Sequence, residues 1–214
     1  MEHVSSKKER DKAVVVAVVR RFGPLSRVDI HDLTRFRPST ISLLVRELIR
    51  EGKLHEVGLS NNPLGRKQIL IGINETYGYV VGVEFDPEIV TAAAMDLSPR
   101  IVGWATEATN LDGGADALVE QLLSCTRKAI QNSKMGGRLP LGIAVADPGL
   151  VDSRRGMTVT SSIIDFWRNV PLREIFEREF RVPFLLESNT RAYTVAERML
   201  GSGEKADDMI YIDS

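Results

Sequence analysis

Hydroxyl and guanidinium side chains recur through residues 38–50 at positions that would share one face of a helix. The other face would carry an apolar stripe at i, i+3, i+4 and i+7, formed by Ile41, Leu44, Val45 and Leu48. The polar face would carry Ser39, Thr40, Ser42, Leu43, Arg46 and Arg50. Hydroxyl groups can bond base edges or phosphates, and an arginine can reach guanine or the backbone of a duplex. The spacing therefore predicts a helix whose polar face can enter a DNA major groove, with an ordinary surface helix as the alternative.

A second helix is predicted immediately before this one, over Arg27–Thr34. Ser26 and Asp29 have the spacing of a capping box, with Asp in place of the usual Glu. The residues available for packing would be Val28, Ile30 and Leu33. A short turn, in which Arg37 is expected to contact DNA, leads to Pro38 at the first position of the next helix. Two helices joined by a short turn favour a helix-turn-helix over a lone surface helix.

Residues 54–73 predict a hairpin next to these helices. Two alternating segments, 54–57 and 69–73, are typical of strands, and a polar, turn-rich tip joins them. The tip carries Arg66 and Lys67 where the chain begins to return. Such cations can lie along a minor groove or a phosphate backbone. We interpret the hairpin as the wing of a winged helix-turn-helix, although the cation pair could also belong to a solvated loop.

The charge of the chain is divided unevenly along its 214 residues. The net charge is −1, but residues 1–74 hold 14 basic and 8 acidic residues, a net charge of +6. Residues 75–214 hold 14 basic and 21 acidic residues, a net charge of −7. A basic first third joined to an acidic remainder indicates a nucleic-acid-binding head on a body with another role. A chance imbalance of solvated faces is the alternative.

Several other chemistries find no support in the sequence. The residues that most often bind zinc are scattered, with no pair at ligand spacing: His3, His31, His55 and Cys125. We therefore predict neither a metal site nor a cofactor. A single cysteine excludes an internal disulfide and fits a reducing cytoplasm. The longest apolar run, 13–19, is far shorter than a membrane helix, and the N-terminus has no secretory signal. We expect a cytoplasmic protein.

Residues 75–214 alternate between strand-like and helix-like patterns. Strands are predicted at 79–85, 90–97, 101–109, 141–146, 184–186 and 209–212. Helices are predicted at 115–132, 172–180 and 189–200, and 147–149 reads as a tight turn. This order predicts a mixed α/β sheet with helices packed on it. The chain as a whole is then α+β, with a DNA-binding domain at 1–74 and a second domain at 75–214.

The chain resembles the ROK family, which groups bacterial transcriptional repressors with sugar kinases. The matching stretches follow in order at 26–34, 39–42, 44–45, 65–66, 79–83, 147–152, 167–172 and 192–203. The resemblance spans about residues 13–214 and implies that 75–214 form one lobe of an actin-like, ribonuclease H-like fold. Family members continue past 211–213 into a Gly-rich phosphate loop and a second lobe. The resemblance therefore implies that the C-terminal lobe is missing from these 214 residues.

The kinase branch of the family has two motifs from which this sequence departs. Where those kinases resemble Asp-x-Gly-x-Thr, residues 84–88 read Glu-Phe-Asp-Pro-Glu and lack the glycines that approach nucleotide phosphates. Where the kinases carry a catalytic Asp, this chain has Asn189, whose amide cannot act as the base. The resemblance points to Glu187, Ser188 and Asn189 as effector-binding residues. Ser188 or Asn189 is equally well explained as the N-cap of the following helix.

These observations and the resemblance together imply a sequence-specific DNA-binding regulator of carbohydrate metabolism, most simply a repressor. Its expected partners are an operator, bound by a homodimer or higher homo-oligomer, and a sugar or sugar derivative bound by the body. We do not expect an enzyme. The alternative is an ATP-dependent, glucokinase-like sugar kinase with an appended DNA-binding head. A third possibility is a regulator that acts through protein interactions and needs no small molecule.

Overall fold

The computed structural model describes residues 7–60, 67–203 and 208–212, and the chain forms two compact units. The first unit spans Met1–Tyr77 and the second Gly78–Ser214. This division falls shortly after residue 74, where the sequence suggested a domain boundary. In the part of the chain that the structure describes, no helix combines the length and the apolar character that crossing a membrane requires.

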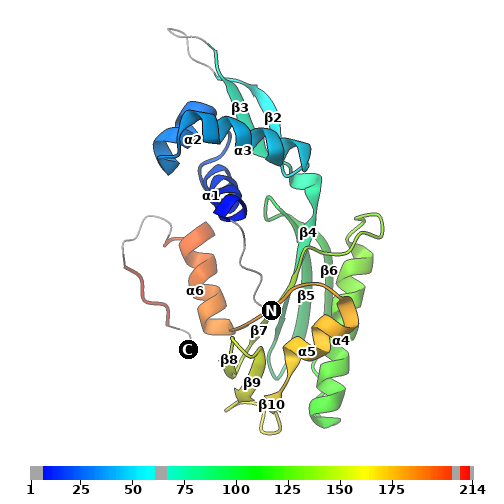
Figure 1. The fold of residues 1–214 in the computed structure, drawn as a ribbon. Helices are drawn as coiled ribbons and strands as arrows, with labels where there is room; N and C mark the ends of the chain where they lie inside the picture. Colours follow the sequence, from blue (N-terminus) through cyan, green and yellow to red (C-terminus); the bar gives the residue numbers. More distant parts are fainter. Residues whose placement is uncertain (1–6, 61–66, 204–207, 213–214) are drawn as a thin grey trace. The chain divides into compact units, whose positions relative to one another are not determined.

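The first unit consists of three helices and a small antiparallel sheet (Figure 1). The helices are α1 (Lys7–Phe22), α2 (Arg27–Thr34) and α3 (Pro38–Arg50). The strands are β1 (Leu25–Ser26), β2 (Leu54–Leu59) and β3 (Ile69–Ile73), in the order β1-β3-β2. The two predicted helices and the strand pair are confirmed. The two-residue strand β1 was not predicted, because so short a strand is defined only by its pairing with β3.

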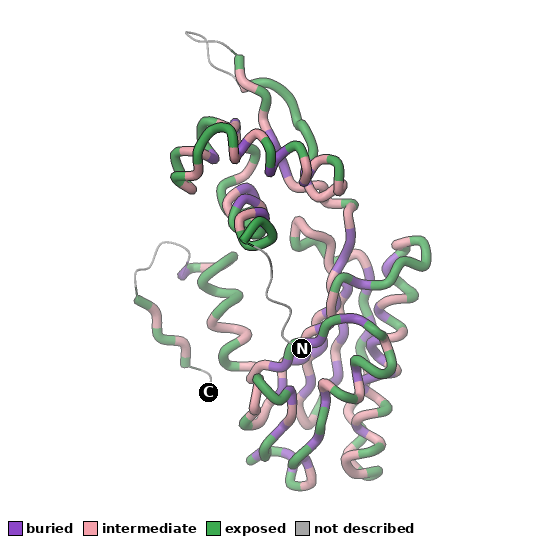
Figure 2. The backbone as a smooth tube through the Cα atoms, viewed as in Figure 1, coloured by how far each residue is buried: buried purple, intermediate pink, exposed green. Residues whose placement is uncertain are grey.

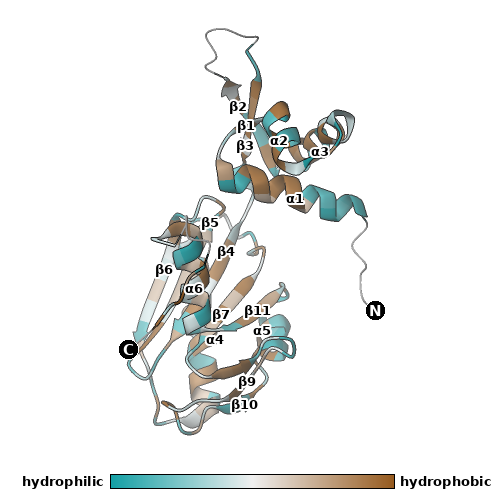
Figure 3. Ribbon diagram, turned by 90° about the vertical axis from the view of Figure 1, so that its left-hand side faces the viewer, coloured by the Kyte–Doolittle hydropathy of each residue, from teal (hydrophilic) through white to brown (hydrophobic). Residues whose placement is uncertain are grey.

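The core of the first unit is formed by one side of each helix. In α1 the charged residues come first and the apolar ones later, which Figure 3 shows as a change from teal to brown along the helix. All four residues of the predicted α3 stripe are buried. The expectation that Val28 and Leu33 pack inward is wrong, since they are 52% and 47% exposed and only Ile30 of α2 is buried. An eight-residue helix has little more than two turns, so only one of its side chains reaches this small core.

The second unit is built on a five-stranded mixed sheet with the order β11-β7-β4-β5-β6. Its strands are β4 (Tyr79–Phe85), β5 (Ile89–Asp96), β6 (Ile101–Ala108), β7 (Ile143–Asp147) and β11 (Phe184–Ser188). The strands β4, β5 and β6 pair antiparallel, whereas β7 and β11 continue the sheet in parallel. The predicted mixed sheet is confirmed, with strand ends that differ by at most two residues.

Helices lie on both sides of this sheet. Figure 1 shows α4 (Gly114–Asn132) and α5 (Leu172–Phe180) on one side and α6 (Asn189–Leu200) on the other. The core lies between the sheet and the helices α4 and α5, and it includes the buried Leu118 and Leu122 of α4. Ile130 of the same helix is only partly buried. In contrast, α6 has no buried residue and is drawn in pink and green in Figure 2.

A second, three-stranded sheet follows β7 and was not predicted. It has the order β10-β9-β8 and consists of β8 (Leu150–Asp152), β9 (Met157–Thr160) and β10 (Arg168–Val170). The expected turn at 147–149 connects β7 to this sheet, but Asp147 does more than close a turn. Its carboxylate is fully buried and accepts hydrogen bonds from the Gly149 N–H (2.7 Å), the Thr158 hydroxyl and the Trp167 indole N–H (2.8 Å). Burial raises the pKa of Asp147 above its usual range.

The final strand predicted at 209–212 is wrong. These residues are described but form no strand, and Ile210 and Ile212 are 88% and 83% exposed. An alternating apolar pattern becomes a strand only where a neighbouring strand completes its hydrogen bonds. None of the strands in the described ranges pairs with 209–212.

We predict that Asp147→Ala destabilises the second unit by about 2–4 kcal/mol, because three donors, two of them buried, lose their acceptor at once. Both tryptophans, Trp104 and Trp167, lie in this unit. Urea unfolding followed by tryptophan fluorescence therefore reports on it. Asp165→Ala, which truncates an exposed carboxylate nearby, is the matched control and should shift stability by less than about 0.5 kcal/mol. Equal unfolding midpoints for the two variants would contradict the assignment.

Candidate nucleic-acid interface

The outer face of α3 carries the polar residues that the sequence placed there. Ser39, Leu43, Arg46 and Arg50 form an exposed line along the helix, while Thr40 and Ser42 beside it are half-buried. The buried apolar stripe fixes this orientation, because rotating α3 about its axis would expose the stripe to water. Pro38 begins the helix and Arg37, which is exposed, precedes it as N-cap without a side-chain hydrogen bond.

The polar side chains of this face are available to a ligand. Among the residues that the structure describes, no hydrogen bond or ion pair engages the side chains of Arg37, Ser39, Thr40, Ser42 or Arg46. Hydroxyl and guanidinium groups in this state remain hydrated and can exchange water for base edges or phosphates. The sequence therefore identified a set of residues that the fold brings together on one surface.

The carboxylates of Glu47 on α3 and of Glu51, the C-cap of that helix, face the opposite way, toward α1. Lys12 lies 2.5 Å from a Glu51 oxygen and 3.3 Å from a Glu47 oxygen, and its side chain is only 9% exposed. Glu47 is also 2.6 Å from Lys8, and Glu51 is 2.8 Å from Lys53. The acidic residues of α3 are thus neutralised by lysines on its inner side. Arg46 and Arg50 consequently give the outer face a positive charge that no acid of the same helix offsets.

These ion pairs shift the pKa values of their members. The hydrogen bond from Lys12, with that from Lys53, lowers the pKa of Glu51 to about 2. The hydrogen bond from Lys8 likewise lowers the pKa of Glu47. The pKa of Lys12 is raised, chiefly by its hydrogen bond to Glu51. All these groups therefore stay charged across the neutral range.

The turn before α3 is held by local bonds that the sequence only partly revealed. The predicted capping box at α2 is confirmed, since the Ser26 hydroxyl accepts the Asp29 N–H (3.2 Å) and the Asp29 carboxylate accepts the Ser26 N–H (2.9 Å). At the other end, Arg35 adopts the left-handed conformation with φ of 60°. His31 Nδ1–H donates to the Phe36 carbonyl (2.6 Å), tying α2 to the turn. The sequence predicted the turn at 35–37, but not the left-handed conformation of Arg35 or the hydrogen bond of His31, because neither residue type is typical of turns.

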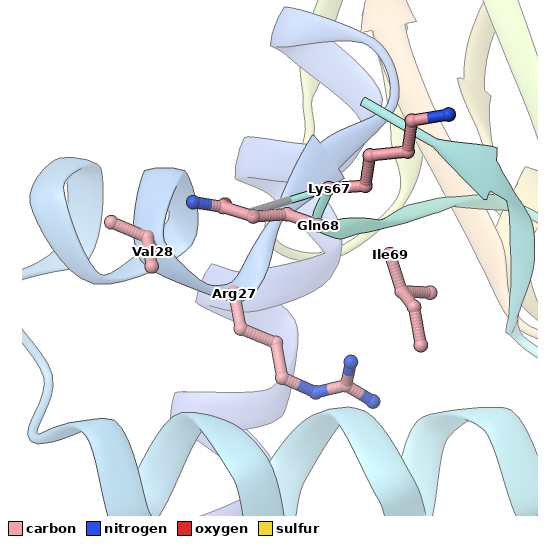
Figure 4. A pocket seen from close by; sticks show the side chains of 5 residues that line it. All are labelled: Arg27, Val28, Lys67, Gln68 and Ile69. Carbon is pink, nitrogen blue, oxygen red and sulfur yellow. The ribbon is translucent and has the colours of Figure 1, made fainter. Parts of the chain in front are cut away.

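The hairpin contributes a cation near the start of α2. Lys67 is exposed at the beginning of the returning strand, whereas Arg66 lies outside the described residues. Lys67, Gln68 and Ile69 line a shallow hollow together with Arg27 and Val28, and Figure 4 shows the side chains of Arg27 and Lys67 extending in different directions around it. Arg27 lies 3.7 Å from Glu56, so Lys67 is the more available cation.

The expected effector residues lie together in the second unit, where β11 meets α6. Glu187 accepts hydrogen bonds from the Ser153 hydroxyl (3.3 Å) and the Ser188 N–H (3.1 Å) and pairs with Arg191 (3.3 Å). Ser188 is the N-cap of α6 but makes no side-chain capping bond, while Asn189 accepts the Thr190 N–H (2.7 Å). Ser188 pairs with Asp147 across parallel strands. The carboxyl ends of parallel strands are where α/β sheets bind ligands.

The acidic turn at 84–88 is closed by hydrogen bonds to one of its own carboxylates. The Asp86 carboxylate accepts the N–H groups of Glu88 (2.6 Å) and Ile89 (2.8 Å), which closes the hairpin between β4 and β5. Both amides are therefore engaged by a carboxylate of the same turn.

Comparison with known proteins shows to which family the chain belongs. Residues 89–213 match the ROK family, and the chain belongs to that family. It is 25% identical over 207 residues to the xylose repressor of Caldicellulosiruptor bescii, covering 96% of this chain and 51% of the repressor. A crystal structure of a ROK family transcriptional regulator, a homologue of E. coli MLC, superposes with a TM-score of 0.75 and 21% identity over 94% of this chain and 50% of that one.

The second unit also shares its fold with an enzyme. A ROK family glucokinase from Streptomyces griseus, in complex with glucose and AMPPNP, superposes with a TM-score of 0.54 and 24% identity over 61% of this chain and 39% of that one. The chain spans about half the length of the xylose repressor that it matches.

We predict that low pH destabilises the fold of the first unit because Glu51 becomes protonated. Its folded pKa, about 2, lies below the usual value of 4.5, so its contribution is complete above pH 4.5 and is lost as the pH falls toward 2. Glu51→Gln should remove that part of the acid sensitivity, up to about 1 kcal/mol for a partly exposed pair. Hydrogen-exchange protection of α1 and α3 amides, compared at pH 6 and pH 3, measures it.

The matched control is Asp32→Asn, which neutralises an exposed carboxylate of α2 outside this cluster. It should keep the acid sensitivity of the unaltered chain. If Glu51→Gln lost as much protection between the two pH values as the unaltered chain, the ion pairs of Lys12 would not hold α1 to α3.

Proposed function

We propose that the chain is a sequence-specific DNA-binding transcriptional regulator, acting as a repressor, whose first unit is a winged helix-turn-helix. The observation that carries this proposal is the division of α3 into two faces. The carboxylates of Glu47 and of the C-cap Glu51 pair with α1, and the hydroxyls and arginines, which have no partner among the residues that the structure describes, lie on the other face. The names of two similar proteins, a xylose repressor and a ROK family transcriptional regulator, support the same function.

In this function α3 enters the major groove. Ser39, Thr40, Ser42, Leu43 and Arg46 face the bases, and Arg37 lies at the entry of the helix. The hairpin of β2 and β3 is the wing, with Lys67 and Arg66 directed to the minor groove or the phosphates. Two copies of the chain bind as a homodimer or within a higher oligomer, so that two recognition helices contact half-sites about 34–36 Å apart.

We further propose that the second unit binds a sugar or a sugar derivative. Glu187, Ser188 and Asn189 stand where β11 ends, beside the end of the parallel strand β7. A relative named xylose repressor and a structural neighbour holding glucose support this class of ligand. The effector releases DNA if it binds the DNA-incompetent state more tightly than the competent one. Such a regulator acts on the chromosome and is therefore cytoplasmic.

We propose no phosphotransfer by these residues. Asn189 offers an amide where a base is needed, and its oxygen already accepts a backbone N–H. Asp86 is likewise used by the turn that contains it. A sugar kinase with an appended head remains the competing function, and hexose-dependent ADP formation would support it. A regulator that responds only to a partner protein would show no saturable heat in calorimetry with any sugar.

The first test is fluorescence anisotropy of the protein on DNA from upstream of its own gene, at two salt concentrations, with and without a panel of sugars. We expect tight, salt-sensitive binding that one sugar releases, because cations on α3 and the hairpin displace counterions from the duplex. Binding no tighter than to random DNA would overturn the proposal for the first unit. Specific binding that no sugar alters would overturn only the proposed effector.

A pair of variants separates base recognition from phosphate contact. Arg46→Ala should weaken operator binding by about 1–3 kcal/mol and relax sequence preference, because a guanine loses its partner. Lys67→Ala should weaken all DNA alike and reduce the slope of log K against log salt by about 1. Titrations of operator and random duplexes at several salt concentrations measure both. Unchanged binding by the two variants would mean that another surface contacts DNA.

A further inference from the structure

Leu43 is an aliphatic residue in the middle of the polar face of α3. It is 48% exposed, whereas the apolar stripe of the same helix is buried. Its neighbours along the exposed line are Ser39, four residues before it, and Arg46, three residues after it. Neither neighbour has a side-chain partner within the described residues. Leu43 therefore stands between two groups that can bond to bases.

Leu43 does not belong to the core of the first unit. The core and the residues packed against it come from α1, α2, α3 and the small sheet, and Leu43 is absent from both sets in the described ranges. Consecutive helical residues are about 100° apart around the axis, so that Leu44 is buried while Leu43 faces outward. Burial within this unit does not explain a leucine at position 43.

The major groove offers one apolar feature to such a side chain. Guanine, cytosine and adenine present hydrogen-bond donors and acceptors there, and thymine adds its C5-methyl group. A leucine has no donor or acceptor, so it can gain only by removing an apolar group from water. Given the DNA-binding function proposed above, on which this step rests, we propose that Leu43 reads a thymine methyl group in the operator.

The helix geometry also limits where that thymine lies. Leu43 and Arg46 are three residues apart, which is about 4.5 Å along a helix axis. Successive base pairs are about 3.4 Å apart along the duplex. The thymine therefore lies within one or two base pairs of the base that Arg46 contacts.

The test begins with the complete 214-residue chain and a library of random duplexes, from which bound sequences are enriched. Each thymine of the enriched half-site is then replaced, one at a time, by deoxyuridine, which lacks only the methyl group. At one position the unaltered protein should bind roughly fourfold more weakly, the effect of one methyl group removed from water. Leu43→Ala should bind the thymine and uracil duplexes equally well.

Two further variants keep the test independent of folding. Leu33→Ala truncates a leucine of almost equal exposure, 47%, on α2, and should keep the preference for thymine over uracil. Leu43→Gln should enrich adenine in place of thymine at the same position, because glutamine bonds to adenine N6 and N7. Far-UV circular dichroism should show unchanged helix content in all three variants.

The outcomes distinguish this inference from the function on which it rests. If no sequence is enriched, the proposed DNA-binding function fails. If a sequence is enriched but uracil is accepted at every thymine, the function stands and the role of Leu43 is wrong. The role of Leu43 is also wrong if Leu43→Ala keeps the preference for thymine over uracil.

Discussion

The contact between Lys12 of α1 and the carboxylates of Glu47 and Glu51 determines what the first unit presents to its surroundings. It adds to the buried apolar stripe a second reason for α3 to adopt one rotation about its axis. A nearly buried ammonium needs its carboxylates, so both acids face inward. The outer face is then left with hydroxyls, one leucine and two arginines. A surface suited to a polyanion is thus a consequence of how α1 and α3 pack.

The second unit has the fold of sugar kinases, and several of its polar side chains make hydrogen bonds within the unit itself. Asp147 is buried among three donors and joins the main sheet to the small one. Asp86 closes a hairpin, and Asn189 accepts a backbone N–H at the start of α6. The polar groups of these residues therefore stabilise the two sheets, the hairpin and the start of α6.

Local signals explain how much of the fold could be predicted. The capping box at Ser26, Pro38 at the start of α3 and the apolar stripe each act within one or two turns, and the predicted helices were confirmed. The strands β1, β8, β9 and β10 were missed, since two to four residues become a strand only through a distant partner. The prediction of a strand at 209–212 is wrong for the converse reason. Its pattern is strand-like, but none of the described strands pairs with it.

The sequence by itself determined which side chains share the outer face of α3, because helical periodicity follows from the order of residues alone. It also placed an amide side chain, not an acid, at position 189. Only the tertiary structure decided that the acids of α3 are neutralised by α1, that Val28 and Leu33 remain exposed, and that Asp147 is a buried acceptor. Each of these depends on residues brought together from distant parts of the chain, and a pairing of that kind has no local signature in the sequence.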